Sequence, residues 1–155
     1  MNLFTLKRHC LMPALALLFF SACKKDTYTS EVFIKKQWKV DLSASKVLPA
    51  ISGRTDHAVA MVYLIDNMEV HYDIYFDKAL ENSDTPGSAK IYLGTETTLG
   101  TVFIDLKTPA FNANRETSGL VGVDAATATK LQSEKIYLQI SSAQQPNGLV
   151  RGQLN

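Results

Sequence analysis

The 155-residue sequence has only two cysteines, Cys10 and Cys23, and both lie near its N-terminus. No cysteine follows position 23, which excludes a disulfide framework and a thiolate metal site in the rest of the chain. A domain formed by that remainder must be stable through packing alone, which roughly 130 residues can achieve.

The sequence also lacks an excess of charge of one sign. It contains 16 basic and 15 acidic residues, for a formal net charge of +1. Domains that bind nucleic acid ordinarily carry a concentrated basic excess. The even balance therefore argues against a nucleic-acid partner.

Long hydrophobic runs are missing as well. The apolar run at residues 10–20 has 11 residues, whereas a membrane-spanning helix needs about 20. Lys7 and Arg8 precede this run, and a basic segment followed by a short apolar one is typical of a secretory signal peptide. We therefore predict that residues 1–22 are a cleaved signal peptide.

Residues 20–23 (Phe-Ser-Ala-Cys) resemble a bacterial lipobox, in which an apolar residue and two small residues precede an acylated cysteine. The resemblance implies that Cys23 carries acyl chains such as palmitate and anchors the protein stably in a membrane. Because Lys24 follows, the sorting rule of Gram-negative lipoproteins implies the outer membrane, with a periplasmic or surface-exposed domain. Residues 23–35 are then the lipidated N-terminus and tether. The alternative is a signal peptide cut elsewhere, with Cys23 incidental.

From residue 36 onward the hydrophobic pattern has a period of two, which is typical of strands. The pattern predicts strands at residues 38–42, 58–65, 69–76, 89–93, 101–106, 119–123, 136–141 and 149–154. Turn residues separate them at 66–67, 85–87, 94, 100, 109 and 146–148. One helix is expected at residues 125–132, capped by Asp124. The fold class is thus all-β, a Greek-key sandwich or barrel of about seven to nine strands over residues 36–155.

Residues 146–154 read Pro-Asn-Gly-Leu-Val-Arg-Gly-Gln-Leu. This end resembles the closing motif of the CHRD (chordin) domain family, Pro-X-Gly-Glu-Ile-Arg-Gly-Gln-Leu. Residues 137–140 are similar to the family's preceding Tyr strand. Residues 47–49 with 58–64 resemble its opening segment, and residues 100–106 its central strand. The resemblance spans about residues 36–155 and implies a β-sandwich.

The sequence departs from this family where many relatives have histidine. Their Ala-His-Ile-His stretch reads Ala-Lys-Ile-Tyr at residues 89–92, and Ser141 stands in place of a third histidine. Leu149 replaces the motif's Glu. The family's histidines have invited comparison with copper/zinc superoxide dismutase, a β-sandwich with histidine ligands. This chain lacks all three histidines, so these positions lack the imidazole side chains that a metal ion would need here.

The closing motif supplies the first candidate site. Gly148 suits a left-handed turn position, and Gly152 within a strand indicates a bulge or a close backbone approach. Arg151 is expected to pair with a carboxylate or with loop carbonyls that close the sandwich. In the alternative reading, Arg151 is a clamp for the carboxylate of a ligand.

Other candidates are weaker. His71 and Asp73 lie two apart on one predicted strand and share a face, and with His57 they are the only start of a metal site, which needs three or four ligands. In the simpler interpretation, both histidines are surface or half-buried strand residues without a ligand role. The loop carboxylates Glu81, Asp84 and Glu96 are expected to be solvated, the alternatives being an acid/base pair or a calcium site. Tyr75 and Tyr92 are candidates for an exposed patch that contacts carbohydrate or protein.

No nucleophile motif or phosphate-binding loop occurs in the chain. The leading hypothesis is therefore a membrane-anchored, non-enzymatic binding or scaffolding module of the cell envelope, without a cofactor. Its partner would be an unidentified protein or carbohydrate. One alternative is a metal-binding or redox protein related in fold to copper/zinc superoxide dismutase. Another is a purely structural envelope lipoprotein.

Overall fold

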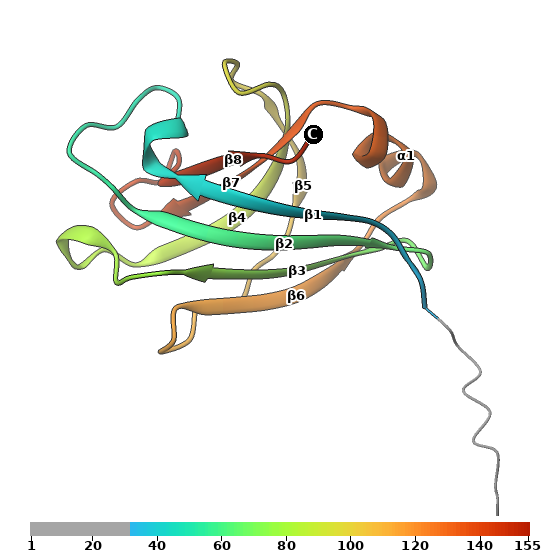
Figure 1. The fold of residues 1–155 in the computed structure, drawn as a ribbon, viewed down its shortest axis with the longest axis horizontal. Helices are drawn as coiled ribbons and strands as arrows, with labels where there is room; N and C mark the ends of the chain where they lie inside the picture. The colour runs from blue at the N-terminus through green and yellow to red at the C-terminus, as the bar shows by residue number, and fades with distance from the viewer. Residues whose placement is uncertain (1–31) are drawn as a thin grey trace, which may run out of the picture. The chain divides into compact units, whose positions relative to one another are not determined.

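The computed structural model describes residues 32–155, so the predicted signal peptide, Cys23 and the tether up to residue 31 lie outside the described residues. The described chain forms eight strands that make one curled sheet, in the order β5-β4-β7-β8-β1-β2-β3-β6 (Figure 1). Every pairing is antiparallel. The elements are β1 (Ile34–Ser43), the 3-10 turn η1 (Ala44–Lys46), β2 (His57–Ile65), β3 (Glu69–Phe76), the 3-10 turn η2 (Glu81–Ser83), β4 (Pro86–Leu93), β5 (Thr101–Asp105), β6 (Glu116–Gly122), α1 (Ala125–Ser133), β7 (Ile136–Ser142) and β8 (Val150–Gln153).

The all-β prediction is confirmed, with one short helix where it was expected. Most strand ends agree with the period-two pattern to within one or two residues. Three elements differ more: β4 begins at Pro86, inside the predicted turn at 85–87, β6 begins at Glu116, three residues early, and β1 begins four residues before the predicted strand at 38–42. β1 begins at Ile34, two residues before the expected start of the domain. A proline at the first residue of a strand is tolerated because no ladder hydrogen bond is needed from its nitrogen there.

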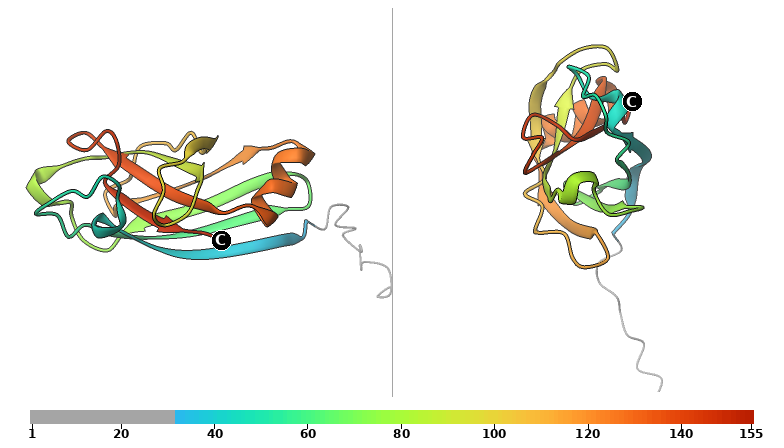
Figure 2. Two further views of the ribbon diagram at one scale, coloured as in Figure 1. Left: turned by 90° about the horizontal axis from the view of Figure 1, so that it is seen from above. Right: turned by 90° about the vertical axis from the view of Figure 1, so that its left-hand side faces the viewer.

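The sheet curls so that, seen from its end, the strands surround a shared interior (Figure 2). Alternate residues of each strand point inward, as β3 shows with Val70, Tyr72, Ile74 and Phe76 buried between more exposed neighbours. This alternation is what a sheet with one wet face requires. The interior is filled by large apolar side chains, among them Leu42, Val62, Leu64, Ile91, Leu106, Ile136, Leu138 and Ile140.

Helix α1 lies between β6 and β7 and starts where the sequence predicts. The Asp124 carboxylate accepts a hydrogen bond from the Thr127 backbone N–H at 2.7 Å, an N-cap that satisfies a free donor of the first turn. That same bond holds the pKa of Asp124 below its ordinary value. Ala128 and Leu131 are the residues of α1 that reach the core. No helix within residues 32–155 combines the length and apolarity needed to span a membrane.

A buried ion cluster ties three loops together at the end of the sheet away from α1. Arg54 Nε lies 2.5 Å from Asp56 Oδ2, and Arg54 Nη2 lies 3.0 Å from Asp84 Oδ2. Ser142 Oγ donates to the same Asp84 oxygen at 2.6 Å. The expectation that Asp84 is solvated is therefore wrong, since its side chain is fully buried. It is buried because it is the counter-ion of Arg54, a partner 30 residues away that no local pattern indicates.

Candidate functional site

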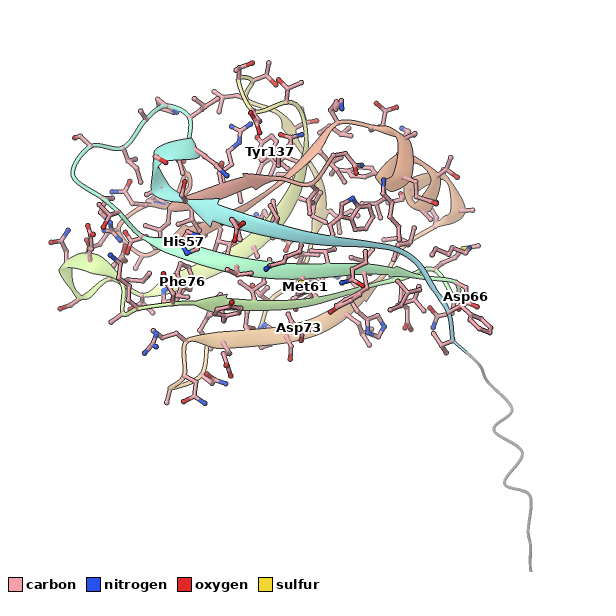
Figure 3. All side chains as sticks on the ribbon, viewed as in Figure 1. His57, Met61, Asp66, Asp73, Phe76 and Tyr137 are labelled. Atoms are coloured by element: carbon pink, nitrogen blue, oxygen red, sulfur yellow. The ribbon has the colours of Figure 1, made fainter. Side chains whose placement is uncertain are left out.

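Arg151 lies in the middle of the sheet and is almost completely buried, with 1% of its surface exposed. It sits on β8, opposite Gln139 of β7 and Ser43 of β1. Its guanidinium carbon lies 3.5 Å from the centre of the Tyr137 ring, which Figure 3 labels. The other face of Tyr137 stacks on Tyr92, with ring centres 5.1 Å apart and planes 2° from parallel. The three side chains form a stack in which the cation contacts an aromatic face.

The loop between β4 and β5, residues 94–100, is fastened over this stack. Arg151 Nη2 donates to the carbonyl oxygens of Thr95 and Thr98, at 2.5 Å and 2.8 Å. The Gly100 N–H donates to the Tyr137 hydroxyl at 3.0 Å. Gln153 Nε2 also donates to the loop, to the Gly94 carbonyl at 3.1 Å. The sequence predicts a carboxylate or loop carbonyls as structural partners of Arg151, and the structure shows loop carbonyls.

Both glycines of the closing motif occupy positions that leave no room for a side chain. Gly148 has a φ of +139°, and a Cβ there would lie 2.6 Å from the Gln139 amide nitrogen. A Cβ on Gly152 would lie 2.7 Å from the Asp41 carbonyl oxygen of β1. Gly152 therefore permits the close backbone approach between β8 and β1 that keeps Arg151 in place.

A hollow of about 260 Å³, which we call the Arg151 cleft, opens between η1 and the β4–β5 loop. Its walls are Ser45, Lys46, Leu48, Glu96, Thr97, Arg151, Gly152 and Gln153. Two of these side chains have a buried polar atom without a hydrogen-bond partner, Arg151 Nη1 and Gln153 Oε1.

Within residues 32–155, no carboxylate lies close enough to Arg151 to form an ion pair. Burial lowers the pKa of Arg151, and the more distant Glu96 partly opposes that shift. The cleft thus has two basic side chains, Lys46 and Arg151, against one acidic side chain. Sequence reasoning identified Arg151 but missed Lys46, Gln153 and the loop, because they come from separate segments that only the folded sheet brings together.

The three positions that carry histidine in many relatives lie on the outward face of β4 and β7. Tyr92 faces Tyr137 across the two strands, and Lys90 faces Gln139. Lys90 pairs with Asp105 at 3.7 Å, and Ser141 lies 3.3 Å from the hydroxyl of Ser88. In the described part of the chain, no group of three or more His, Cys, Asp or Glu side chains is arranged to hold a metal ion.

The structure does not bring the two remaining histidines together. His57 stands at the start of β2 and lies 3.3 Å from Asp77, while His71 faces Tyr63 near the other end of that strand. The His71 ring nitrogen lies 2.9 Å from Glu69, and this hydrogen bond lowers the pKa of the Glu69 carboxyl. Each histidine thus has its own single carboxylate partner.

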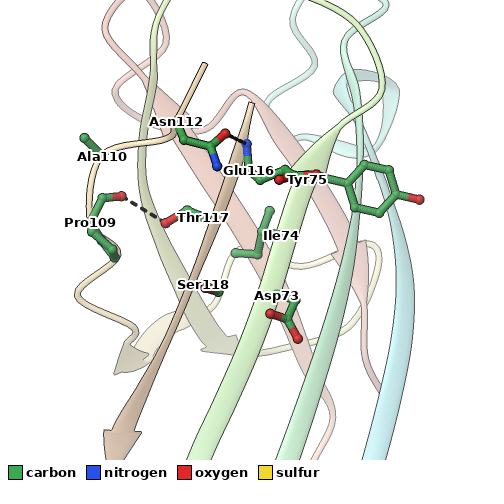
Figure 4. A pocket seen from close by; sticks show the side chains of 9 residues that line it. All are labelled: Asp73, Ile74, Tyr75, Pro109, Ala110, Asn112, Glu116, Thr117 and Ser118. Carbon is green, nitrogen blue, oxygen red and sulfur yellow. Dashed lines mark hydrogen bonds between the residues drawn. The ribbon is translucent and has the colours of Figure 1, made fainter. Parts of the chain in front are cut away.

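A second hollow of about 490 Å³ lies over β3, β6 and the segment before β6 (Figure 4). Thr117 donates to the Pro109 carbonyl at 3.1 Å and the Glu116 N–H donates to Asn112 at 3.0 Å, so these polar groups already have partners. Tyr75 borders the hollow and is 44% exposed. Four strands lie between β3, which carries Tyr75, and β4, which carries Tyr92, in the sheet order, so Tyr75 and Tyr92 do not form one patch.

These features define a class of protein: an antiparallel β domain whose last strand carries a buried arginine that holds a loop over the sheet. The family model of the CHRD domain matches residues 38–154, and the chain belongs to this family. The match includes the whole Tyr92–Tyr137–Arg151 stack and both glycines of the closing motif. No curated protein and no solved structure matches the chain.

Proposed function

We propose that the protein is a lipid-anchored component of the cell envelope whose CHRD domain binds an acidic ligand in the Arg151 cleft without transforming it. The observation that carries the binding role is the buried guanidinium of Arg151, whose Nη1 has no partner and which borders an open hollow. The envelope location rests on the sequence of residues 1–24, through the predicted signal peptide and acylated Cys23.

A buried charge is costly unless an opposite charge and hydrogen bonds compensate it. Arg151 is compensated at Nη2 by two carbonyl oxygens and on one face by the Tyr137 ring. An acidic group in the cleft would add the missing opposite charge, because a guanidinium fork matches the geometry of a carboxylate. The Lys46 ammonium at the cleft wall favours the same class of ligand. We therefore expect a ligand that presents a carboxylate.

Isothermal titration calorimetry of the mature chain in detergent tests this proposal, with acetate and succinate as probes and sodium chloride at equal ionic strength as the blank. We expect saturable binding that weakens about tenfold in Lys46→Gln. Lys39→Gln is the matched control, since Lys39 is an exposed lysine of β1 outside the cleft. Absence of saturable heat with both probes, or equal affinity of the Lys46→Gln and Lys39→Gln variants, would refute the acidic-ligand proposal.

A neutral carbohydrate at the second hollow is the other candidate, favoured by exposed Tyr75 beside the carboxylates of Asp73 and Glu116. An apolar ring face next to polar acceptors suits a polyhydroxylated ligand. Retention on immobilised glycans that is lost in Tyr75→Ala would support this candidate. Stoichiometric copper or zinc in the purified protein would instead favour the metal-binding alternative.

A further inference from the structure

The exposed apolar side chains of the domain are concentrated at one end. Among residues 32–155, eight large hydrophobic residues are exposed, and five of them are Val32, Phe33, Ile34, Met68 and Leu120. We call these five residues the apolar end. They belong to the start of β1, the β2–β3 turn and the last part of β6, which lie together at the right of Figure 1.

Hydrogen bonds and a common hollow show that the apolar end is one surface. The Asp66 N–H in the β2–β3 turn donates to the Phe33 carbonyl at 2.9 Å. The Met68 carbonyl accepts from the Val123 N–H, just after β6, at 2.8 Å. Ile34 and Leu120 line the same hollow of about 450 Å³ on the outer face of the sheet. Figure 3 labels Asp66 at this end of the molecule.

We infer that the apolar end rests on the lipid bilayer that holds the acyl chains of Cys23. This inference depends on the proposed lipid anchor but is independent of the acidic ligand. It identifies a bilayer surface as the partner of these five side chains and gives the domain one orientation. The loops at the far ends of β3 and β6 then point away from the membrane.

The length of the intervening chain supports the bilayer as the occupant. Eight residues separate Cys23 from Val32, and at about 3.5 Å per residue they reach at most roughly 30 Å. The anchor therefore keeps the apolar end close to the membrane, where even a weak surface contact is favoured by a high effective concentration.

The composition of the apolar end also fits an interface with lipid better than one with a second copy. Large apolar side chains beside an exposed lysine, here Lys35, are typical of segments that lie in the membrane interface. A stable protein–protein interface needs about 800 Å² and 20 to 30 residues from each partner. Five exposed apolar residues in a turn and two strand ends fall well short of that number.

Depth-dependent fluorescence quenching tests the inference on the lipidated protein reconstituted into phosphatidylcholine vesicles. A bimane probe is attached to a cysteine at Asn67, in the exposed β2–β3 turn, or at Asn114, an exposed turn residue before β6. The matched positions lie at opposite ends of β3 and leave the apolar end intact. We expect lipids with a spin label near the headgroup to quench the Asn67→Cys probe about threefold more strongly than the Asn114→Cys probe.

Two double variants then separate this surface from general hydrophobicity. Phe33→Ser with Leu120→Ser removes two apolar-end side chains, whereas Leu99→Ser with Val102→Ser removes two exposed apolar side chains elsewhere. We expect the first pair to abolish the excess quenching at Asn67 and the second pair to preserve it. Equal quenching at both probe positions, or the same effect from both pairs, would overturn the inference. So would a fluorescence shift at Asn67 that needs no lipid and rises with protein concentration, since a second copy would then cover the surface.

The mass of the extracted protein shows whether Cys23 is acylated, and it therefore distinguishes a wrong lipid anchor from a wrong bilayer contact. If Cys23 carries no acyl chain, the proposed lipoprotein is wrong. The quenching at Asn67 and Asn114 is then measured in vesicles of the same lipid to which nickel-chelating lipid is added. A hexahistidine tag at residue 23 holds the protein on these vesicles. Excess quenching at Asn67 under those conditions still supports a bilayer-binding surface, and its absence refutes one.

Discussion

The guanidinium carbon of Arg151 lies over the Tyr137 ring, 3.5 Å from the ring centre. Tyr137 in turn rests on Tyr92, so a residue of β8 is supported by residues of β7 and β4. The contact explains how a full positive charge is accommodated in the middle of a sheet. The ring face attracts the cation, and two loop carbonyl oxygens accept hydrogen bonds from Nη2.

We expect Arg151→Lys to destabilise the domain by about 2–4 kcal/mol, because lysine lacks the planar guanidinium that contacts the Tyr137 ring while its Nη2 donates to both loop carbonyls. Urea unfolding followed by circular dichroism measures the change. The exposed residue Lys39 gives a control, and Lys39→Ala should change the free energy of unfolding by no more than about 0.5 kcal/mol. A loss in Arg151→Lys as small as that of the control would contradict the role assigned to the stack.

Gly152→Ala should cost about 2–4 kcal/mol, because its Cβ would lie 2.7 Å from both the Asp41 carbonyl oxygen and Val40 Cγ2. Relieving the contact with the carbonyl requires β8 to move away from β1. Gly122→Ala is the matched substitution in β6, where an added Cβ meets no atom within 4 Å. The melting temperatures of both variants test this prediction. Equal melting temperatures would show that the approach of β8 to β1 is not tight.

The stability of the domain should fall in acid through Asp84. Burial alone raises the pKa of this carboxyl, but hydrogen bonds from Ser142, two backbone N–H groups and Arg54 together bring it below the ordinary value of 3.8. The unfolded chain regains the ordinary value, so the contribution of Asp84 is complete above that pH and is lost as the pH falls through the lower folded pKa.

We expect Asp84→Asn to be less stable than the parent by about 2 kcal/mol at pH 7, and to lose less stability between pH 5 and pH 2. Urea unfolding across this pH range gives both quantities. Asp105→Asn is the control, because Asp105 belongs to a surface pair with Lys90 and should matter little. Parallel pH profiles of Asp84→Asn and the parent protein would show that the buried cluster does not carry the acid sensitivity.

Cys23→Ala should release the protein from the membrane fraction and abolish labelling with radioactive palmitate, since acyl chains are the proposed anchor. Cys10→Ala should retain both the location and the label, because Cys10 belongs to the predicted signal peptide. Fractionation and autoradiography of the two variants provide the readout. Label that persists in Cys23→Ala would place the cleavage site elsewhere and remove the basis of the anchor.

Local patterns in the sequence were sufficient to predict the all-β fold class, the position of α1 and the family. The alternation in residues 69–76 predicted β3 at its true ends, and Asp124 caps α1 as expected. Patterns failed where a residue's environment depends on a distant segment. The sequence predicts a solvated Asp84, although Arg54 buries it, and a patch shared by Tyr75 and Tyr92, although four strands separate them.

The sequence by itself determined that this chain is an all-β CHRD domain with Gly148, Arg151 and Gly152 in its closing motif, because side-chain alternation and glycine placement act over a few neighbouring residues. Only the tertiary structure decided what Arg151 meets. Strand order and register place Thr95 and Thr98 beside a residue more than 50 positions later, and they set His57 and His71 apart. These contacts depend on how eight strands pair across the sheet, which no short stretch of sequence specifies.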